Sequence, residues 1–134
     1  MKAVVDTRFL IDSLAVADQD FQNSSRQIFQ TLQRKENLGV IPSIVIYEFY
    51  KFLLETLGKD VAELRVSSLL KLDFKKANLD IPIAIQAAKL RCKYAELPTA
   101  DAVIAATGII LDCDYVLTDD KHIRQVREVK TRWI

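Results

Sequence analysis

The chain has 134 residues, half of them hydrophobic, and a formal net charge of +1 at pH 7. This length fits a single domain over residues 1–134 and is enough to bury a core without disulfides or structural metals. The near balance of charge excludes a protein that coats nucleic acid through overall positive charge. Any contact with nucleic acid must therefore come from local placement of charge.

The two cysteines, Cys92 and Cys113, form neither a C-x-x-C pair nor a zinc-ligand pattern. We expect both to be small buried apolar residues, reduced as in cytoplasmic proteins. Asp6 and Arg8 interrupt the N-terminal apolar run, which argues against a signal peptide. The longest apolar stretch, residues 102–111, is shorter than the roughly 20 residues that a membrane span needs. We therefore predict a soluble cytoplasmic protein without membrane contact.

A short apolar run opens the chain. Residues 2–5 predict a buried parallel strand that ends at Asp6, and the apolar residues that follow have helical spacing. A turn and N-cap signal at residues 23–25 predicts the start of an amphipathic helix that ends near Asn37 and Gly39.

The middle of the chain repeats this alternation. Residues 39–41 predict a second strand, and Pro42 begins a helix that Gly58 ends. Residues 59–71 predict a further helix, and residues 72–74 a third strand. The side chains of the helix at 59–71 that we expect to point inward are Val61, Leu64, Leu69 and Leu70.

The last third continues the pattern. Asp80 begins a helix that runs to about Tyr94, and residues 100–111, apolar almost all round, predict a buried central helix. Residues 114–117 predict a strand followed by a short basic helix, and residues 129–131 predict an edge strand. Strands that alternate with helices imply an α/β fold, with a parallel sheet covered on both faces.

The chain has only three glycines and contains neither a G-x-G-x-x-G nor a P-loop pattern. A nucleotide-cofactor fold would have no phosphate cradle here.

Acidic residues occur at informative places along this pattern. Asp6 follows the first strand, and Asp119 and Asp120 follow the strand at residues 114–117. The carboxyl ends of strands form the edge of an open α/β sheet where ligands bind. Glu48 and Asp101 instead lie within apolar helices, where a buried unpaired carboxylate is costly.

Each acid also has a structural explanation. Asp101 falls in a first helical turn, where the helix dipole stabilises an acid. Asp119 or Asp120 could cap a helix, Asp6 could be a turn residue, and Glu48 could be solvated. If the four carboxylates converge, however, two of them about 4 Å apart repel by roughly 4 kcal/mol at an effective dielectric near 20. A divalent cation would relieve this repulsion, and Mg²⁺ or Mn²⁺ suits oxygen ligands.

Four blocks of the sequence, which together span nearly the whole chain, resemble the PIN-domain family. They are Val4-Val5-Asp6-Thr7, Pro42-Ser43 followed by Glu48, Leu97-Pro98-Thr99-Ala100-Asp101-Ala102, and Val116-Leu117-Thr118-Asp119-Asp120-Lys121-His122. The third block is the most specific, and the order of all four is stronger than any one. The combination is similar to small stand-alone PIN proteins, including VapC-type toxins of toxin–antitoxin pairs.

The resemblance implies a three-layer α/β/α sandwich with a central parallel sheet. It implies a ribonuclease that depends on Mg²⁺ or Mn²⁺ and hydrolyses RNA phosphodiester bonds. It also implies a homodimer, with a small antitoxin protein as a possible partner.

The family's acids are carried over by position. Asp6, Glu48, Asp101 and Asp120 become the catalytic and metal-binding set, and Asp119 could substitute as a metal ligand. Thr7, Arg8 and Thr118 become residues of the substrate site, where the threonines would position acids or water. Arg8 departs from the family, which usually has a small polar residue there; its guanidinium could clamp phosphate or pair with an acid. Ile123 replaces a common aromatic, which we interpret as a packing change.

RNA binding would require positively charged side chains around these acids. The candidates are Arg8, Lys89, Arg91, Lys93, Lys121, Arg124 and Arg127, although solvated helix faces are the commoner meaning of such charges. Tyr47 and Tyr50 could stack on bases, but packing is the favoured interpretation. We interpret His122, the only histidine, as a helix surface residue rather than a catalyst.

Two other classes of function compete with the nuclease: a catalytically silent PIN-like protein, and a phosphatase or phosphoacceptor α/β domain. A catalytically silent PIN-like protein could bind RNA or serve as a scaffold, although the intact acid set argues against it. A phosphatase of the haloacid dehalogenase type would need Asp-x-Asp-x-Thr after the first strand, and the run Asp6-Thr7-Arg8-Phe9-Leu10 lacks it. A receiver-type domain would need paired acids at the first strand end, which are also missing.

Overall fold

The computed structural model describes residues 1–14 and 19–133. Among these residues five parallel strands form one sheet, in the order β3-β2-β1-β4-β5. Their bounds are Lys2–Val5 for β1, Leu38–Pro42 for β2, Lys75–Ala77 for β3, Tyr115–Leu117 for β4 and Thr131–Arg132 for β5. The prediction of an α/β fold with a central parallel sheet is confirmed.

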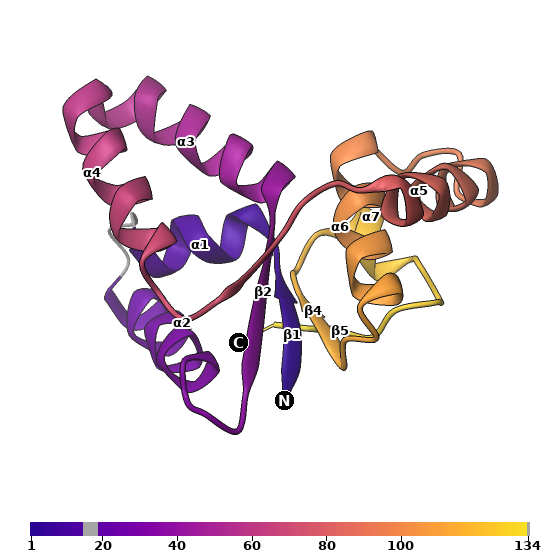
Figure 1. Ribbon diagram of the computed structural model, residues 1–134, viewed down its shortest axis with the longest axis horizontal. Helices are drawn as coiled ribbons and strands as arrows, with labels where there is room; N and C mark the ends of the chain where they lie inside the picture. The colour runs from indigo at the N-terminus through magenta and orange to yellow at the C-terminus, as the bar shows by residue number, and fades with distance from the viewer. Residues whose placement is uncertain (15–18, 134) are drawn as a thin grey trace.

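Helices cover both faces of this sheet (Figure 1). On one side lie α1 (Thr7–Leu14), α2 (Gln19–Leu32), α3 (Ser43–Leu57) and α4 (Lys59–Leu70). On the other lie α5 (Ile81–Lys93), α6 (Thr99–Ile110) and α7 (Lys121–Arg124). The three-layer α/β/α arrangement is therefore present.

The middle strands are short and wholly apolar where they cross the core. Val4 and Val5 of β1, together with Val40 and Ile41 of β2, have no exposed surface. Strands buried on both faces lose the alternation of polar and apolar residues that marks a half-exposed strand. Helix α6 packs against β1, β2 and β4, which explains why it is apolar almost all round.

The order of the strands determines where a site can form. The chain runs outward from β1 through β2 to β3, then returns to the other side of β1 to form β4 and β5. Strand order therefore reverses between β1 and β4. The carboxyl ends of two strands at such a reversal leave a crevice, because their connections leave on opposite faces of the sheet.

The local signals for α3, α5 and α6 were sufficient to find these helices. Gly58, with a φ of 83°, ends α3, and an ordinary side chain would be strained there. Asp80 caps α5 by accepting a hydrogen bond from the backbone N–H of Ile83 at 3.1 Å. Pro98 precedes α6 with an extended backbone.

Three predictions of element bounds were wrong. Residues 23–25 do not begin a helix, because α2 starts at Gln19 and runs through them, and α2 ends at Leu32 rather than near Asn37. The third strand lies at residues 75–77 instead of 72–74. Phe74, which suggested a strand, packs its ring over Gly39, where a Cβ would lie 2.2 Å from the ring. The last strand begins at Thr131, at the end of the predicted range.

The expected inward face of α4 was also largely wrong. Leu69 is buried, whereas Val61, Leu64 and Leu70 are exposed. Helix α4 packs mainly on α3 at the outside of the molecule, so only a narrow face of it meets other residues. The cysteines are free thiols, as expected, but they are less buried than expected, since Cys92 is exposed and Cys113 half-buried. Among the described residues no helix is long and apolar enough to cross a membrane.

Candidate functional site

Asp6 stands at the carboxyl end of β1, directly beside the end of β4. Its side chain is buried, with 7% of its surface exposed. Oδ1 accepts a hydrogen bond from the backbone N–H of Thr7 at 2.7 Å, and Oδ2 accepts one from the Thr118 hydroxyl at 2.6 Å. Burial raises the pKa of Asp6 to about 6, with further increases from Asp120 and Glu48, while the two hydrogen bonds oppose the rise.

Glu48 reaches the same region from α3. Its Oε1 accepts a hydrogen bond from the Thr7 hydroxyl at 2.7 Å. Thr7 therefore contacts two acids, Asp6 through its backbone N–H and Glu48 through its hydroxyl. One residue at the start of α1 holds together carboxylates that are 42 positions apart in the chain.

Asp101 lies in the first turn of α6, and this helix lies on the opposite side of the sheet from α3, which carries Glu48 (Figure 1). Burial raises the pKa of Asp101 to about 7, and repulsion from Asp120, Asp6 and Glu48 adds to the rise, while His122 lowers it. The Coulombic causes of this shift include each of the other three acids. The four carboxylates that the sequence singled out therefore lie close enough to repel one another, although only Asp101 and Asp120 of the four belong to the group of potential metal ligands found among the described residues.

Asp120 follows β4 and caps the short helix α7. Its backbone N–H donates to the Thr118 hydroxyl at 3.0 Å, and its Oδ1 accepts from the backbone N–H of His122 at 2.7 Å. The Thr118 hydroxyl thus donates to Asp6 and accepts from Asp120, so it fixes the two strand-end acids relative to one another.

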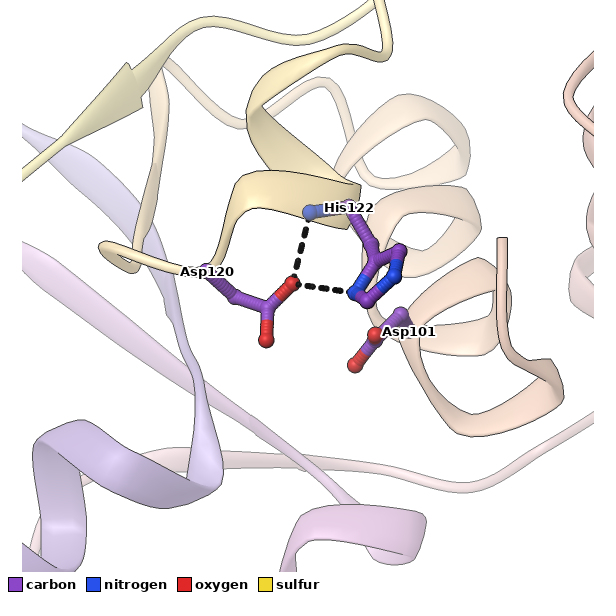
Figure 2. A group of neighbouring side chains, drawn as sticks. All are labelled: Asp101, Asp120 and His122. Carbon is purple, nitrogen blue, oxygen red and sulfur yellow. Dashed lines mark hydrogen bonds and ion pairs between the residues drawn. The ribbon is translucent and has the colours of Figure 1, made fainter. Parts of the chain in front are cut away.

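The imidazole of His122 faces the acids. Its Nδ1 lies 3.2 Å from Oδ1 of Asp120 (Figure 2). Asp101, Asp120 and His122 each offer one ligand atom, and these three atoms lie within 4.8 Å of one another. They form the group of potential metal ligands found among the described residues. The residue interpreted as a helix surface residue is thus only partly exposed and borders the acidic site. Its position two residues after Asp120, within one helical turn, was the available signal.

Asp119 points to a different partner. Nη1 of Arg8 lies 2.9 Å from Oδ2 of Asp119 and donates to Oδ1 at 3.1 Å. Arg8 also approaches Asp12, with Nε 3.6 Å from Oδ2, and its guanidinium lies 5.9 Å from the centre of the Trp133 ring. Asp119 is therefore engaged in an ion pair beside the acid cluster instead of facing Asp101.

The remaining candidate contacts for RNA are spread over two regions. Lys121 and Arg124 are exposed on α7, next to Asp120, and Arg8 is exposed on α1. Lys89, Arg91 and Lys93 lie exposed on α5, and Arg127 is exposed after α7. Lys93 pairs with Glu128 at 3.1 Å. Tyr47 is 61% exposed on α3, and Tyr50 is half-buried.

The donor set fits a hard divalent cation. Carboxylate oxygens are the ligands that Mg²⁺ and Mn²⁺ favour, and the imidazole of His122 lies beside two of these carboxylates. Burial, together with repulsion between the acids, raises the pKa of Asp6 and of Asp101, so ionising both is costly in the metal-free protein. A divalent cation would offset that cost, so the residues present suit such an ion.

Comparisons with known proteins agree with this architecture. A sequence model described as the PIN domain matches residues 3–129. Among curated protein sequences no significant match is found.

Solved structures of similar fold cover the whole chain at low identity. VapBC2 from Rickettsia felis, bound to a promoter DNA fragment, has a TM-score of 0.82 at 15% identity, over 100% of this chain and 99% of that one. A toxin–antitoxin complex from Klebsiella pneumoniae has a TM-score of 0.72 at 22% identity, over 98% and 99%. The sarcin–ricin loop cleaving toxin VapC20 from Mycobacterium tuberculosis has a TM-score of 0.76 at 17% identity, over 96% and 98%.

Proposed function

The chain belongs to the PIN-domain family, and from that premise we propose that it is a single-domain, cytoplasmic endoribonuclease that depends on Mg²⁺ or Mn²⁺. The observation that carries the proposal is the meeting of Asp6, Glu48, Asp101 and Asp120, which come from four separate segments, at the point where strand order reverses. Such a cluster of like charges is costly to fold, and the cost is understandable if it binds a cation.

In the proposed mechanism the four carboxylates would hold the divalent cation. When bound, this ion supplies Lewis acidity towards the phosphate and lowers the pKa of water for attack on phosphorus. Thr118 orients Asp6 through its hydroxyl, and Thr7 orients Glu48 in the same way. These bonds fix the direction of the carboxylate lone pairs before any ligand arrives, which limits the reorganisation that binding requires.

Cations at the border of the cluster would attract the RNA backbone. Arg8, Lys121 and Arg124 are exposed on α1 and α7, the helices that begin beside Asp6 and Asp120. In this proposal their positive charges attract a phosphate group that approaches the acids. In this proposal Arg8 has a double role, because it neutralises Asp119 and still presents 61% of its side-chain surface to solvent. Phosphate contacts of this kind give affinity without sequence preference.

The proposed biological role is that of the toxin in a toxin–antitoxin pair. The similar structures include VapBC and toxin–antitoxin complexes, and their likeness covers nearly the whole chain. Exposed apolar side chains on α3, α4 and α5 provide surface for a second copy and for a small antitoxin. They include Tyr47, Leu54, Leu57, Leu64, Ile81 and Ile85.

Cleavage of a mixed pool of RNAs by the purified protein tests the proposal. We expect internal cleavage with Mn²⁺ or Mg²⁺, loss of cleavage with EDTA, and recovery when Mn²⁺ is added in excess. Asp101→Asn should remove the activity. If the wild-type protein binds RNA with micromolar affinity but cleaves none of the pool with either ion, the silent RNA-binding or scaffold function replaces the nuclease.

A further inference from the structure

The three side chains in Figure 2 differ in chemistry from an all-carboxylate site. Asp101 comes from α6, whereas Asp120 and His122 come from the start of α7. Their ligand atoms lie within 4.8 Å of one another. Two ligands on one octahedral ion lie about 3 Å apart when they are adjacent, given bonds of about 2.1 Å. The 3.2 Å between Nδ1 of His122 and Oδ1 of Asp120 already matches that spacing.

The backbone that carries the His122 ring is held by hydrogen bonds, and the ring itself contacts Asp120 through Nδ1. The backbone N–H of His122 donates to Asp120, and the N–H of Asp120 donates to Thr118. The next residue, Ile123, is fully buried and anchors α7 against the core. Because the backbone on both sides is held, only the side-chain torsions of His122 can move the ring, and its observed position borders Asp101.

We propose that His122 is a nitrogen ligand of the divalent cation held by Asp101 and Asp120, and that it shifts the preference of the site from Mg²⁺ towards Mn²⁺. This inference rests on the metal site of the proposed function. Mg²⁺ strongly prefers oxygen ligands, whereas imidazole suits first-row transition ions. A single imidazole among carboxylates is enough to separate two ions that otherwise share the same ligands.

A positioning role is the competing interpretation. In one tautomer Nδ1–H donates to Asp120 and orients its carboxylate, and the ring never contacts the ion. The variant His122→Asn separates the two roles, because its amide N–H₂ can donate to Asp120 at a position close to that of Nδ1. The amide offers an ion only an oxygen, and no imidazole nitrogen. His122→Ala removes both functions.

Electron spin-echo envelope modulation of bound Mn²⁺ tests direct contact. Metal-free protein is loaded with less than one equivalent of Mn²⁺, without RNA. We expect modulation from a directly bound ¹⁴N nucleus in the wild type and its loss in both His122→Asn and His122→Ala. A wild-type spectrum without this coupling, or one that persists in His122→Ala, would overturn the inference.

Calorimetric titration of the same three proteins with Mn²⁺ and with Mg²⁺ measures the selectivity. Loss of the imidazole should weaken Mn²⁺ binding by at least about tenfold in both variants, since even the loss of an outer-shell partner costs about 10- to 100-fold, whereas Mg²⁺ binding should change by less than about threefold. Equal weakening for both ions, or full recovery of Mn²⁺ affinity in His122→Asn, would show a positioning residue instead. The melting temperatures of the metal-free variants should stay near that of the wild type, since His122 is partly exposed.

Neither measurement uses RNA, so the two proposals can fail separately. A ¹⁴N signal from His122 in a protein that cleaves no RNA would support this inference and contradict the proposed nuclease. Mn²⁺ bound without the signal would contradict only the role of His122. A wild-type protein that binds no Mn²⁺ would contradict this inference together with the metal dependence of the nuclease.

Discussion

The acid cluster has two halves that are stabilised differently. In the inner half, Asp6 is buried and receives hydrogen bonds from Thr7 and Thr118, and Glu48 receives one from Thr7. In the outer half, Asp101 is half-buried, and burial, followed by repulsion from three acids, raises the pKa of its carboxyl. The inner carboxylates are satisfied by the protein itself. Within the described part of the chain no hydroxyl bonds Asp101 in the same way, so a cation contributes most there.

This difference shows how a fold can tolerate a cluster of like charges. Hydroxyl and backbone N–H donors hold two carboxylates in place without neutralising them. The remaining repulsion between carboxylates acts mainly on Asp101, which is half-buried, so solvent weakens the repulsion there. The metal-free protein can therefore fold before any ion binds.

Removing a carboxylate from either half should have the largest effect on cleavage. Asp6→Asn and Asp101→Asn should each reduce the cleavage rate by at least about a thousandfold, which corresponds to about 4 kcal/mol of activation free energy. The measurement is single-turnover cleavage of a defined RNA with Mn²⁺. Asp112→Asn is the control, because Asp112 lies beyond the far end of α6 in a left-handed conformation that Asn tolerates. Full activity in the double variant Asp6→Asn/Asp101→Asn would refute the proposed site.

Thr118→Val tests the inner half. The substitution keeps the shape of a side chain that is 1% exposed and removes the hydroxyl that joins Asp6 and Asp120. Leaving buried polar groups without a partner should lower the free energy of unfolding by about 1–3 kcal/mol. Urea denaturation at pH 8 measures the change. Thr7→Val is the comparison, and it should cost less because Thr7 is half-buried; a larger loss for Thr7→Val would show that the Thr7 hydroxyl stabilises the inner half more than that of Thr118.

The pH dependence of stability tests the outer half. Burial, followed by repulsion from Asp120, raises the pKa of Asp101 to about 7 from an ordinary value of 3.8. Between these values the folded protein binds a proton that the unfolded chain has lost, so this group stabilises the fold at low pH and loses that contribution as pH rises towards 7.

Metal-free Asp101→Asn should therefore gain stability over the wild type as pH rises from about 4 to 8. We expect a gain of about 1–2 kcal/mol at pH 8, less than the full pKa shift implies because the carboxylate is partly solvated. Denaturation curves of both proteins in the presence of a chelator give the difference. A difference that stays constant over this pH range would contradict the raised pKa.

Arg8→Ala should have the smallest effect. The Arg8–Asp119 pair is exposed on the arginine side, so its loss should lower the free energy of unfolding by less than about 1 kcal/mol. If Arg8 contacts phosphate, the slope of log Kd against log salt for RNA binding should fall by about one. Lys35→Ala, at an exposed lysine just before β2, is the matched control for the loss of one positive charge, and an equal fall in the slope there would contradict a specific phosphate contact of Arg8.

Local patterns determined much of the fold. The apolar runs at residues 3–5 and 115–117, the helix ends at Gly58 and Pro98, and the cap at Asp80 each depend on only a few neighbouring residues. Signals of this kind can be interpreted without knowing what lies elsewhere in the chain. The acids at strand ends were informative for a different reason, because the carboxyl ends of parallel strands share one edge of the sheet however far apart they lie in the chain.

Tertiary contacts decided the rest. The third strand is set by pairing between Val40 and Lys75, while the apolar Phe74 fills the space above Gly39. Leu64 has helical spacing but is exposed, because α4 packs on another helix instead of the sheet.

The sequence also did not show which groups the charged side chains contact. Arg8 and Asp119 form an ion pair although they lie 111 positions apart in the chain. His122 and Asp101 lie close together although they belong to two different helices. Which group a side chain contacts depends on distances through space. A sequence determines these distances only through the complete fold, and so it could supply the acids but could not show that an imidazole stands among them.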